Sequence, residues 1–361
     1  MRRCNVCAPK RLSEHMRAQT RHVQIGAGMK QERRVPARAG RFMGRVLGGL
    51  LLAFGLITSS AAQVYPSRTI RFIAPFAAGG GSDLIARKLA HALTASLGQP
   101  VVVDNRTGGS GVIGTDIVAK SAPDGHTIMM TTPTFTVNPS LMAKLPYDNI
   151  RDFAPVTLIA TAPHLLAVHP SLPVKFVKDV VALARARPDQ LTFSSGSTGG
   201  SSHLSGALFN SMARIRMTHI PYRGGGQAVL AIVTGEVSLG FVDLVSMLPH
   251  VTTGRVHAIA LTGLKRSAVL SNTPTVAESG YPDFQSGIWY GVVAPARTPP
   301  EIVARLNSEL VKITRTPDFL ASLKAEGAEI VASSPDYFAE HIKRETSRWA
   351  LVIKEAKIIT N

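Results

Sequence analysis

Apolar residues in positions 63–361 follow two alternating patterns. Short continuous apolar runs rich in β-branched residues predict strands, and stretches in which apolar residues recur every three or four positions predict helices. The first pair is a strand from Thr69 to Ala74 and, after a loop over 76–81, a helix that begins at Ser82. Further strands are predicted at 101–104, 126–132, 191–194, 217–221, 237–242 and 256–262, and further helices at 112–121, 174–186, 204–215 and 228–233.

Strands that alternate with helices of this length are typical of βαβ units, so we expect mainly parallel sheets with ligands at the carboxyl ends of the strands. Two longer apolar runs, Val156–Val168 and Gly287–Ala294, bracket the middle of the chain. We interpret them as strands that cross between two α/β lobes with a cleft between them. Residues 63–163 with 287–361 would form one lobe and 164–286 the other; two independent tandem domains are the alternative.

A helical region is expected to close the chain. It opens with Thr298-Pro-Pro-Glu301, the pattern of a capping box, in which a hydroxyl and a carboxylate satisfy each other's backbone amides. Two more helices are predicted from Thr316-Pro317 and from Ser334-Pro335, because proline is favoured in the first helical turn.

The composition is that of a globular protein. With 45% hydrophobic residues the chain can bury a core, which excludes a disordered protein, and two cysteines are too few for a disulfide scaffold. A formal charge of +17 raises the question of a nucleic-acid or membrane-surface partner, but +10 of it lies in residues 1–45. The remaining +7 belongs to residues 63–361, so no nucleic-acid partner is expected.

The basic segment precedes a thirteen-residue apolar run, Val46–Thr58, and then small residues at 60 and 62. A positive n-region, an apolar h-region and a small-residue cleavage site predict a secretory signal peptide over 1–62, cut after Ala62. The run is shorter than the ~20 residues that span a bilayer. An uncleaved anchor is the alternative, and Met29 or Met43 is an alternative start of the chain. We therefore expect a periplasmic protein.

Two loops rich in Gly and Ser are the most informative features. Residues 77–83 (AAGGGSD) and 194–202 (SSGSTGGSS) each follow a predicted strand and open an amphipathic helix. Unpaired backbone N–H groups and the positive end of a helix dipole would face whatever occupies each loop. One such loop is commonly only a helix cap. Two of them, one in each lobe, favour a small anion held between the lobes, and a dicarboxylate would offer one charge to each.

The segment Gly109–Gly114 has the form GxGxxG ahead of a predicted helix. A dinucleotide-binding turn should follow its strand directly, and the next strand should end in an acidic residue. Here the motif stands several residues after Asp104, and the next strand ends in Thr131-Thr132. We therefore expect a strand-to-helix turn and no cofactor.

Motifs for catalysis are largely missing. The sequence has no GxSxG or HExxH motif, and its histidines show no metal-ligand spacing, so no metal site is expected. His203 could act as a base for Ser195 or Ser197, which leaves a periplasmic hydrolase as an alternative function; a packing or capping role is the simpler interpretation. Asp83 is expected to satisfy amides at a helix N-terminus. Asp243, at the end of an apolar strand, is a candidate for contacting a ligand hydroxyl or amine, or else for a capping or salt-bridge role.

The succession of motifs resembles the Bug family, the extracytoplasmic substrate-binding receptors of tripartite tricarboxylate transporters. The motifs include PFAAGGGSD (75–83), LGQPVVVDNRTGGSGVIG (97–114), SAPDGHTI (121–128), NPSLMAKLPYD (138–148), GGSSHLSGALF (199–209), HIPYRGGGQAV (219–229), NTPTVAESGYPDF (272–284) and VVAPARTPPEIVARLN (292–307). The resemblance implies a two-lobed periplasmic-binding-protein fold (Venus-flytrap, type II-like) without enzymatic activity. The ligand would be a small carboxylate, namely a di- or tricarboxylate, an acidic amino acid or an aromatic acid.

The resemblance also implies site residues, because family members hold a carboxylate by main-chain amides and hydroxyls of the two loops. Carried over to this sequence, these are Phe76, Gly80, Gly81 and Ser82 in the first lobe, Thr132 and Thr134 at the end of a third strand, and Ser195, Gly196, Ser197, Gly200 and Ser201 in the second lobe. Ala78, Asp83 and Asp243 complete the candidate set. The family often has Pro at Ala78, Asn at Thr198 and Ser at Gly200, which leaves the side-chain specificity open.

The partners follow from the same resemblance. Membrane permease subunits of a tripartite transporter would receive the ligand, with a sensor kinase as the alternative recipient. The protein is expected to act as a monomer, without a cofactor.

Overall fold

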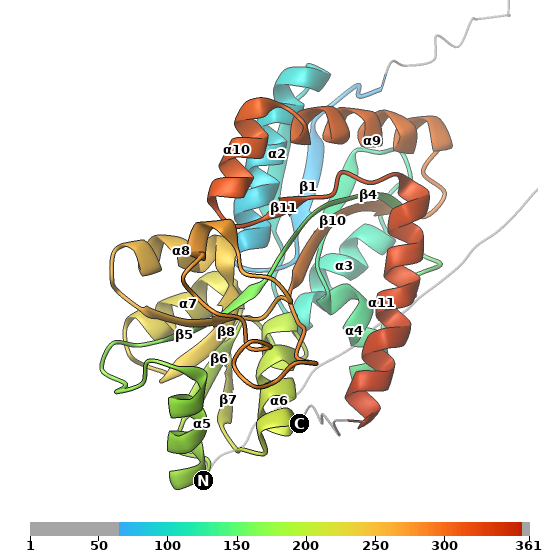
Figure 1. Cartoon of the computed structure of the whole chain (residues 1–361). Helices are drawn as coiled ribbons and strands as arrows, with labels where there is room; N and C mark the ends of the chain where they lie inside the picture. The colour runs from blue at the N-terminus through green and yellow to red at the C-terminus, as the bar shows by residue number, and fades with distance from the viewer. Residues whose placement is uncertain (1–64, 356–361) are drawn as a thin grey trace, which may run out of the picture. The chain divides into compact units, whose positions relative to one another are not determined.

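The computed structural model describes residues 65–355, so the predicted signal peptide lies outside the described residues. The strands form a six-stranded and a five-stranded sheet, each the centre of one lobe (Figure 1). None of the helices in this range combines the length and the hydrophobicity needed to cross a membrane.

The sheet of the first lobe has the strand order β11-β4-β10-β3-β1-β2. Its strands are β1 (Ile70–Ala74), β2 (Val101–Asn105), β3 (Thr127–Thr131), β4 (Phe153–Ala162), β10 (Ile288–Pro295) and β11 (Glu329–Ile330). β1 pairs in parallel with β2 and β3. β10 runs antiparallel to β3 and β4, and β11 runs antiparallel to β4.

The sheet of the second lobe has the strand order β7-β6-β8-β5-β9. Its strands are β5 (His164–Val168), β6 (Thr192–Ser195), β7 (Thr218–Pro221), β8 (Leu239–Asp243) and β9 (His257–Leu261). β6 is parallel to β7 and β8, whereas β5 is antiparallel to β8 and β9.

The expectation of mainly parallel sheets is wrong, since four of these strand pairs are parallel and five are antiparallel. β5 and β10 enter their sheets directly from the other lobe. The right-handed crossover through a helix, which makes neighbouring strands parallel, therefore does not set their direction.

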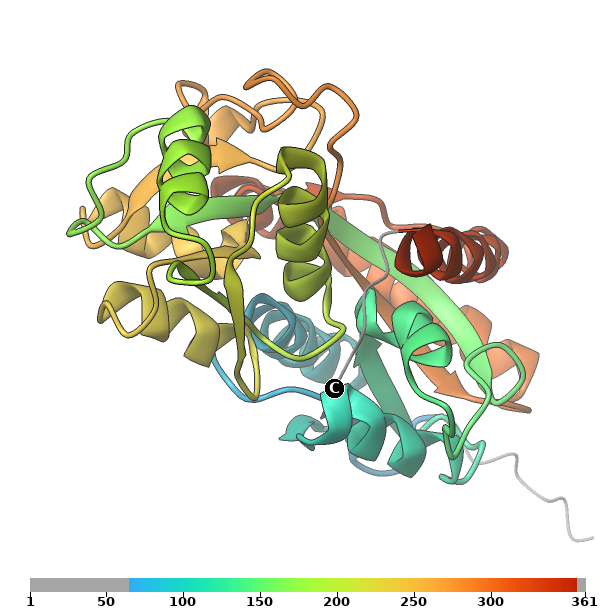
Figure 2. The same cartoon turned by 90° about the horizontal axis from the view of Figure 1, so that it is seen from below.

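The chain passes between the lobes at two places. The apolar run over 156–168 is broken at Pro163 into β4 and β5, which belong to different sheets (Figure 2). Proline has no N–H to donate to a ladder, which suits the boundary between two strands. The other apolar run is β10, which lies wholly in the first sheet, so the second crossing is made by the residues just before Ile288.

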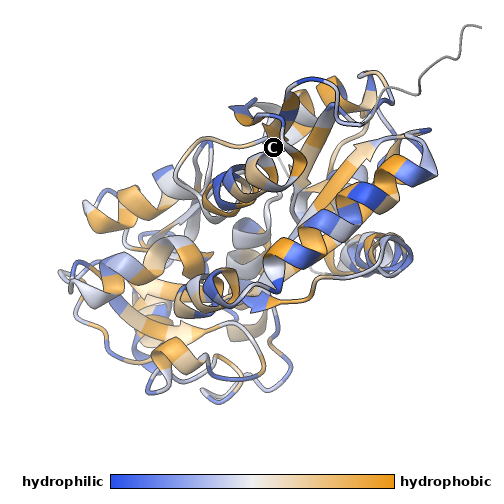
Figure 3. Cartoon of the chain, turned by 90° about the horizontal axis from the view of Figure 1, so that it is seen from above, coloured by the Kyte–Doolittle hydropathy of each residue, from blue (hydrophilic) through white to orange (hydrophobic). Residues whose placement is uncertain are grey.

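Helices cover both faces of each sheet. In the first lobe these are α2 (Gly81–Leu97), α3 (Val112–Ala119), α4 (Thr134–Leu141), α9 (Pro300–Thr314), α10 (Pro317–Ala325) and α11 (Pro335–Glu355); in the second, α5 (Val177–Ala186), α6 (Ser201–Ala213), α7 (Gly225–Val233) and α8 (Leu244–Thr252). Neighbouring residues of β1 show the two layers: Phe72 packs with α2 and α9, and Ile73 with α3 and α11. Apolar and polar positions alternate along the outer helices, as expected for helices with one face on a core (Figure 3).

Three elements were not predicted from the sequence. α4 and α8 are short and carry Pro139 and Pro249 inside the helix, which a pattern search takes as a stop signal. β11 has only two residues and exists through its pairing with β4.

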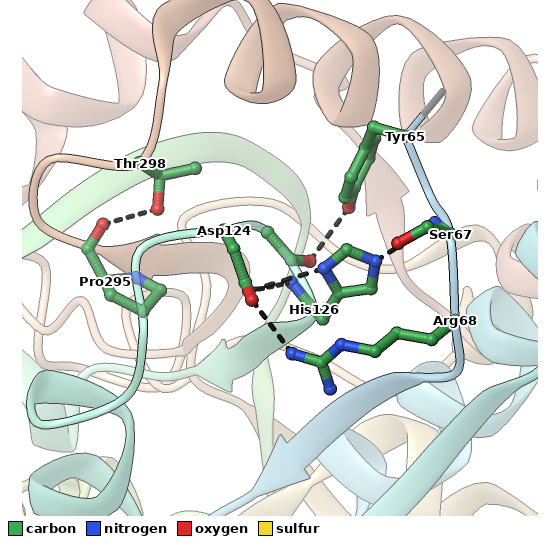
Figure 4. Close-up of polar contacts among 8 residues, drawn as sticks. Tyr65, Ser67, Arg68, Asp124, His126, Pro295 and Thr298 are labelled. Atoms are coloured by element: carbon green, nitrogen blue, oxygen red, sulfur yellow. Dashed lines mark hydrogen bonds and ion pairs between the residues drawn. The ribbon is translucent and has the colours of Figure 1, made fainter. Parts of the chain in front are cut away.

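The predicted capping box is also absent. The hydroxyl of Thr298 donates to the carbonyl of Pro295 at 2.7 Å, and α9 begins at Pro300 without a side-chain cap (Figure 4). Pro299 lacks an N–H, so the reciprocal bond of a capping box has no donor at the N-cap position.

The start of the described chain is fixed to the turn before β3 (Figure 4). The Tyr65 hydroxyl donates to the carbonyl of Gly125 at 2.8 Å, and the amide of Ser67 donates to Nε2 of His126 at 3.2 Å. Arg68 and Asp124 form an ion pair at 2.8 Å. These contacts position the segment that leads into β1 and its carboxyl-terminal loop.

The close packing of β10 against α11 gives a test of the fold. A Cβ atom added to Gly291 would lie 2.1 Å from Cζ of Phe338, a fully buried ring packed on Trp289. We expect Gly291→Ala to destabilise the protein by about 1–3 kcal/mol through overpacking. Thermal unfolding followed by circular dichroism should show a melting temperature several degrees lower.

Gly263→Ala is the matched control, because its added Cβ would meet Pro163 at an ordinary 3.5 Å. Combining Gly291→Ala with Phe338→Leu should recover part of the loss, since the two changes act on one contact. Equal melting temperatures for Gly291→Ala and Gly263→Ala would contradict this packing.

Candidate functional site

A cavity lies between the two lobes, where the carboxyl ends of β1 and β3 face the second sheet. The residues that line it are Phe76, Gly80, Gly81, Ser82, Thr132, Thr134 and Ile288 from the first lobe, and His164, Gly196, Ser197, Gly200, Ser201, Ser202, Gly225, Val242 and Asp243 from the second. The lining includes no Lys or Arg. Any anion held here would therefore be bound by amides and hydroxyls.

The first lobe presents the N-terminus of α2 to the cavity. Gly80 is the N-cap residue and offers no side chain to satisfy the first amides. The amides of Asp83 and Leu84 both donate to the carbonyl of Gly80, at 2.9 and 3.0 Å. Gly81 and Ser82, which line the cavity, come before these first intrahelical donors, so their N–H groups have no acceptor within the helix.

Asp83 holds the first loop from behind. Its carboxylate accepts from the amide of Gly79 at 3.1 Å, from Arg87 at 3.0 Å and from Asn105 at 2.9 Å. Burial opposes ionisation of Asp83, but the hydrogen bonds from Arg87, Asn105 and Gly79 outweigh it and lower its pKa. Asp83 therefore acts as predicted, satisfying an amide at the start of α2, and it does not line the cavity.

The second lobe presents the N-terminus of α6 in the same way. Gly200 is the N-cap residue, again without a side-chain cap, and Ser201 and Ser202 open the helix. Gly199 adopts a φ of +73°, a left-handed conformation that suits glycine. The amide of Gly196 donates to the hydroxyl of Ser202 at 3.2 Å, which folds the loop over the helix end.

Two stacked imidazoles support the second loop. The rings of His203 and His219 lie 3.8 Å apart and nearly parallel. The amide of Gly199 donates to Nδ1 of His203 at 3.0 Å, and Nε2 of His219 contacts the hydroxyl of Ser195 at 2.6 Å. Burial lowers the pKa of His203 to about 4, and burial followed by the charge of His203 lowers that of His219 to about 3. Both rings are therefore neutral at neutral pH.

This arrangement corrects the predicted pairing of His203 with Ser195 or Ser197. His203 is occupied by the amide of Gly199, and His219 is the histidine that contacts Ser195. Ser195 is fully buried, does not line the cavity and donates its hydroxyl proton to the carbonyl of Ser197 at 2.9 Å. His219 is thus the donor in its contact with Ser195, which is the opposite of what a catalytic base does.

His164 is a cavity residue that the sequence analysis missed. It is the first residue of β5, 1% exposed, with Nδ1 2.8 Å from the hydroxyl of Ser205 and Nε2 3.2 Å from that of Ser201. Burial lowers its pKa to about 3, so it lines the cavity as a neutral ring. Its only sequence signal is a histidine inside an apolar run.

Asp243 closes one side of the cavity. It is the N-cap residue of α8 and accepts from the amide of Val245 at 3.1 Å. Its other oxygen accepts from the hydroxyl of Tyr290 on β10 at 2.5 Å, so the contact joins the two lobes. Of the roles expected for Asp243, capping is the one that the structure contains.

Glycines bring the lobes together beside the cavity. A Cβ atom on Gly226 of α7 would lie 2.9 Å from the backbone carbon of Gly79 and 3.0 Å from the carbonyl oxygen of Ala78. The amide of Ala77 donates to the carbonyl of Arg223 at 3.2 Å. Backbone therefore meets backbone at this contact, and side chains are excluded from it.

The GxGxxG segment takes part in the same lobe contact. Its first residues form a short 3₁₀ turn, Gly109–Gly111, four residues after β2. The hydroxyl of Ser110 donates to the carbonyl of Thr198 in the second loop at 2.7 Å. The motif is therefore a turn between β2 and α3 that meets the other lobe.

The structure brings most of the predicted residues to one cavity. Phe76, Gly80, Gly81, Ser82, Thr132, Thr134, Gly196, Ser197, Gly200, Ser201 and Asp243 line it. Asp83 and Ser195 lie behind the loops, and Ala78 is exposed at the lobe contact. Ser202 and Gly225 line the cavity without having been predicted. Within residues 65–355 no group of three or more His, Cys, Asp or Glu side chains could hold a metal ion.

Comparison with known proteins identifies the family. The sequence model of the tripartite tricarboxylate transporter family receptor (TctC) matches residues 85–358. Protein BugT of Bordetella pertussis (strain Tohama I) is 36% identical over 312 residues, which are 86% of this chain and 96% of BugT. The structure of R. palustris Rpa4515 with adipate has a TM-score of 0.80 at 36% identity and covers 82% of this chain and 99% of that chain. The structure of MatC from Rhodopseudomonas palustris with bound malate has a TM-score of 0.77 at 32% identity and covers 80% and 100% of the two chains.

These matches confirm the two-lobed periplasmic-binding-protein fold and the family that the sequence motifs indicated. The chain belongs to the tripartite tricarboxylate transporter receptor family, that is, to the Bug family of periplasmic solute-binding proteins.

Proposed function

We propose that this protein captures a small dicarboxylate between its lobes in the periplasm and delivers it to the membrane subunits of a tripartite tricarboxylate-type transporter. One observation carries the proposal. The N-termini of α2 and α6 come from opposite lobes and open on one cavity whose lining has no basic side chain. Orphan amides at helix N-termini are a ready-made site for a carboxylate.

The two helix ends favour a ligand with two acceptor groups. Each loop has free amides and hydroxyls, Gly81 and Ser82 in one and Ser201 and Ser202 in the other. A dicarboxylate offers one carboxylate to each lobe, so its binding would hold the lobes together. Two relatives of known structure carry adipate and malate, which are both dicarboxylates.

Chemistry on the ligand is not part of this proposal. Ser195, the best-placed nucleophile by sequence, is buried behind the loop and donates its proton to a backbone carbonyl. We assign the protein to solute capture by a monomer made of two lobes, residues 63–163 with 287–361 and residues 164–286, exported by a signal peptide cut near Ala62.

Ligand-dependent thermal stabilisation tests the function directly. A ligand that binds only the folded protein at one hundred times its Kd should add about 2.7 kcal/mol to the free energy of unfolding. Differential scanning fluorimetry with C4–C8 dicarboxylates, citrate, aromatic acids and acidic amino acids should therefore raise the melting temperature for a subset that includes a dicarboxylate. The amides of the same compounds serve as controls, and a panel without any shift would contradict the proposal.

The glycine contact between the lobes predicts a closure variant. Gly226→Ala would place a methyl group against the backbone of Gly79 and Ala78 only when the lobes are together. Overpacking of about 1–3 kcal/mol would then weaken ligand binding about tenfold or more. Isothermal titration calorimetry measures this, and the melting temperature of the ligand-free protein should hardly change.

Leu230→Ala, on the exposed face of the same helix, is the matched control and should bind as the wild type does. Unchanged affinity in Gly226→Ala would mean that the lobe contact is not needed for binding.

The support of the second loop predicts a pair of contrasting variants. His203→Ala leaves the buried amide of Gly199 without its acceptor, which costs about 1–3 kcal/mol. Ligand affinity should fall about tenfold, because the loop loses its backing. His203→Asn places an amide oxygen close to the position of Nδ1 and should bind nearly as tightly as the wild type.

Acid stability separates the same variants from the wild type. The folded pKa of His203 is lowered from 6.5 to about 4, so the unfolded chain takes up the proton first. The stability that the neutral ring contributes above pH 6.5 is therefore lost as the pH falls from 6.5 toward 4. Urea unfolding at pH 7, 6 and 5 should show a smaller loss in His203→Asn. A loss equal to that of the wild type would contradict the role given to His203.

A further inference from the structure

Asp243 conflicts with the proposed function as it stands, and the inference below rests on that function. Among the described residues that line the cavity, Asp243 is the one with a carboxyl side chain. An ionised Asp243 would repel the carboxylate that the two loops are proposed to hold.

The geometry places this carboxyl group directly at the anion site. A Cβ atom added to Gly81 would lie 1.7 Å from Oδ2 of Asp243, so the first turn of α2 lies against that oxygen. The same oxygen accepts from the buried hydroxyl of Tyr290, and Oδ1 accepts from the amide of Val245. The charge of Asp243 thus already stands where α2 presents its free amides.

No free cation near Asp243 offsets its charge. On α2, Asp83 is paired with Arg87, and Lys88 is paired with Glu326 at the end of α10. His164 pairs with Asp243 across the sheet and is a buried neutral ring. Tyr290 on β10 is neutral, because burial and the neighbouring Asp243 raise its pKa. Of the groups that face Asp243, Glu326 adds repulsion.

Two carboxylates that share a buried site cannot both remain ionised without a large penalty, and one of them takes up a proton. We propose that Asp243 takes a proton from solvent when the cavity receives a ligand carboxylate, so that the receptor captures its ligand together with one proton. The proton resides on a carboxyl oxygen of Asp243, whose O–H becomes a donor for the ligand. No other bond forms or breaks.

The electrostatics of the empty cavity agree with this assignment. Burial raises the pKa of Asp243 to about 6, with a further rise from Glu326, against the lowering effect of the hydrogen bonds from Tyr290 and Val245. A bound carboxylate raises that pKa further. Above pH 6 the free receptor is then ionised at Asp243 and the complex is protonated, so ligand affinity falls as the pH rises.

Isothermal titration calorimetry with adipate, and with malate in parallel, tests the proposal. Titrations at pH 6.5, 7.5 and 8.5 lie above the range in which these aliphatic acids titrate themselves. We expect the wild-type affinity to fall by up to tenfold per pH unit. Paired buffers with different ionisation enthalpies should report the uptake of up to one proton per ligand.

Asp243→Asn should remove both effects: its affinity should be independent of pH over this range, with no proton uptake. Tyr290→Phe is the second variant, which keeps the test open if Asp243→Asn does not fold. It removes a hydrogen bond that stabilises the ionised carboxylate, so the fall in affinity should move to higher pH.

Three results would overturn the inference. They are wild-type binding that is independent of pH and takes up no proton, a pH dependence that persists in Asp243→Asn, and a folded Asp243→Asn that binds neither acid at any pH. The last would mean that an ionised Asp243 contacts the ligand. Failure of the wild type to bind any acid of the thermal panel would instead overturn the proposed function, and this inference with it.

Discussion

The amides at the N-terminal ends of α2 and α6 need acceptors that neither helix can supply. Both helices begin after a glycine N-cap, so no side chain caps them, and both open on the same cavity from opposite lobes. In a closed cavity these donors must be met by solvent or by an anion. The relation between the two lobes, the composition of the loops and the choice of ligand all depend on this constraint.

The loops can be small because residues behind them supply the rigidity. Asp83 ties the first loop to Arg87 and Asn105, and the neutral pair of His203 and His219 supports the second. A site built from backbone amides has no positive side chain to neutralise, and it discriminates by the position of its donors. The one ionisable side chain that it does contain, Asp243, makes the balance of charge dependent on whether the cavity is filled.

The sequence predicted those parts of the structure that local patterns determine. The Gly- and Ser-rich loops, the helices that they open and most strands were located from periodicity, and the family from motifs. Strand direction was predicted wrongly, because β5 and β10 enter their sheets from the other lobe. His164 and Gly225 reach the cavity only through tertiary structure, and His219, rather than His203, meets Ser195 because β7 lies beside β6. The capping box at Thr298 failed at a proline that a motif search accepts.

A crystal structure of the protein with adipate would test the central claim most directly. The account predicts that one carboxylate lies within ~3 Å of the amides of Gly81 and Ser82, a hydrogen-bonding distance. The ligand should also meet the amides or hydroxyls of Ser201 and Ser202, with no Lys or Arg in contact. A ligand held by a basic side chain, or bound outside the cavity between the lobes, would contradict it.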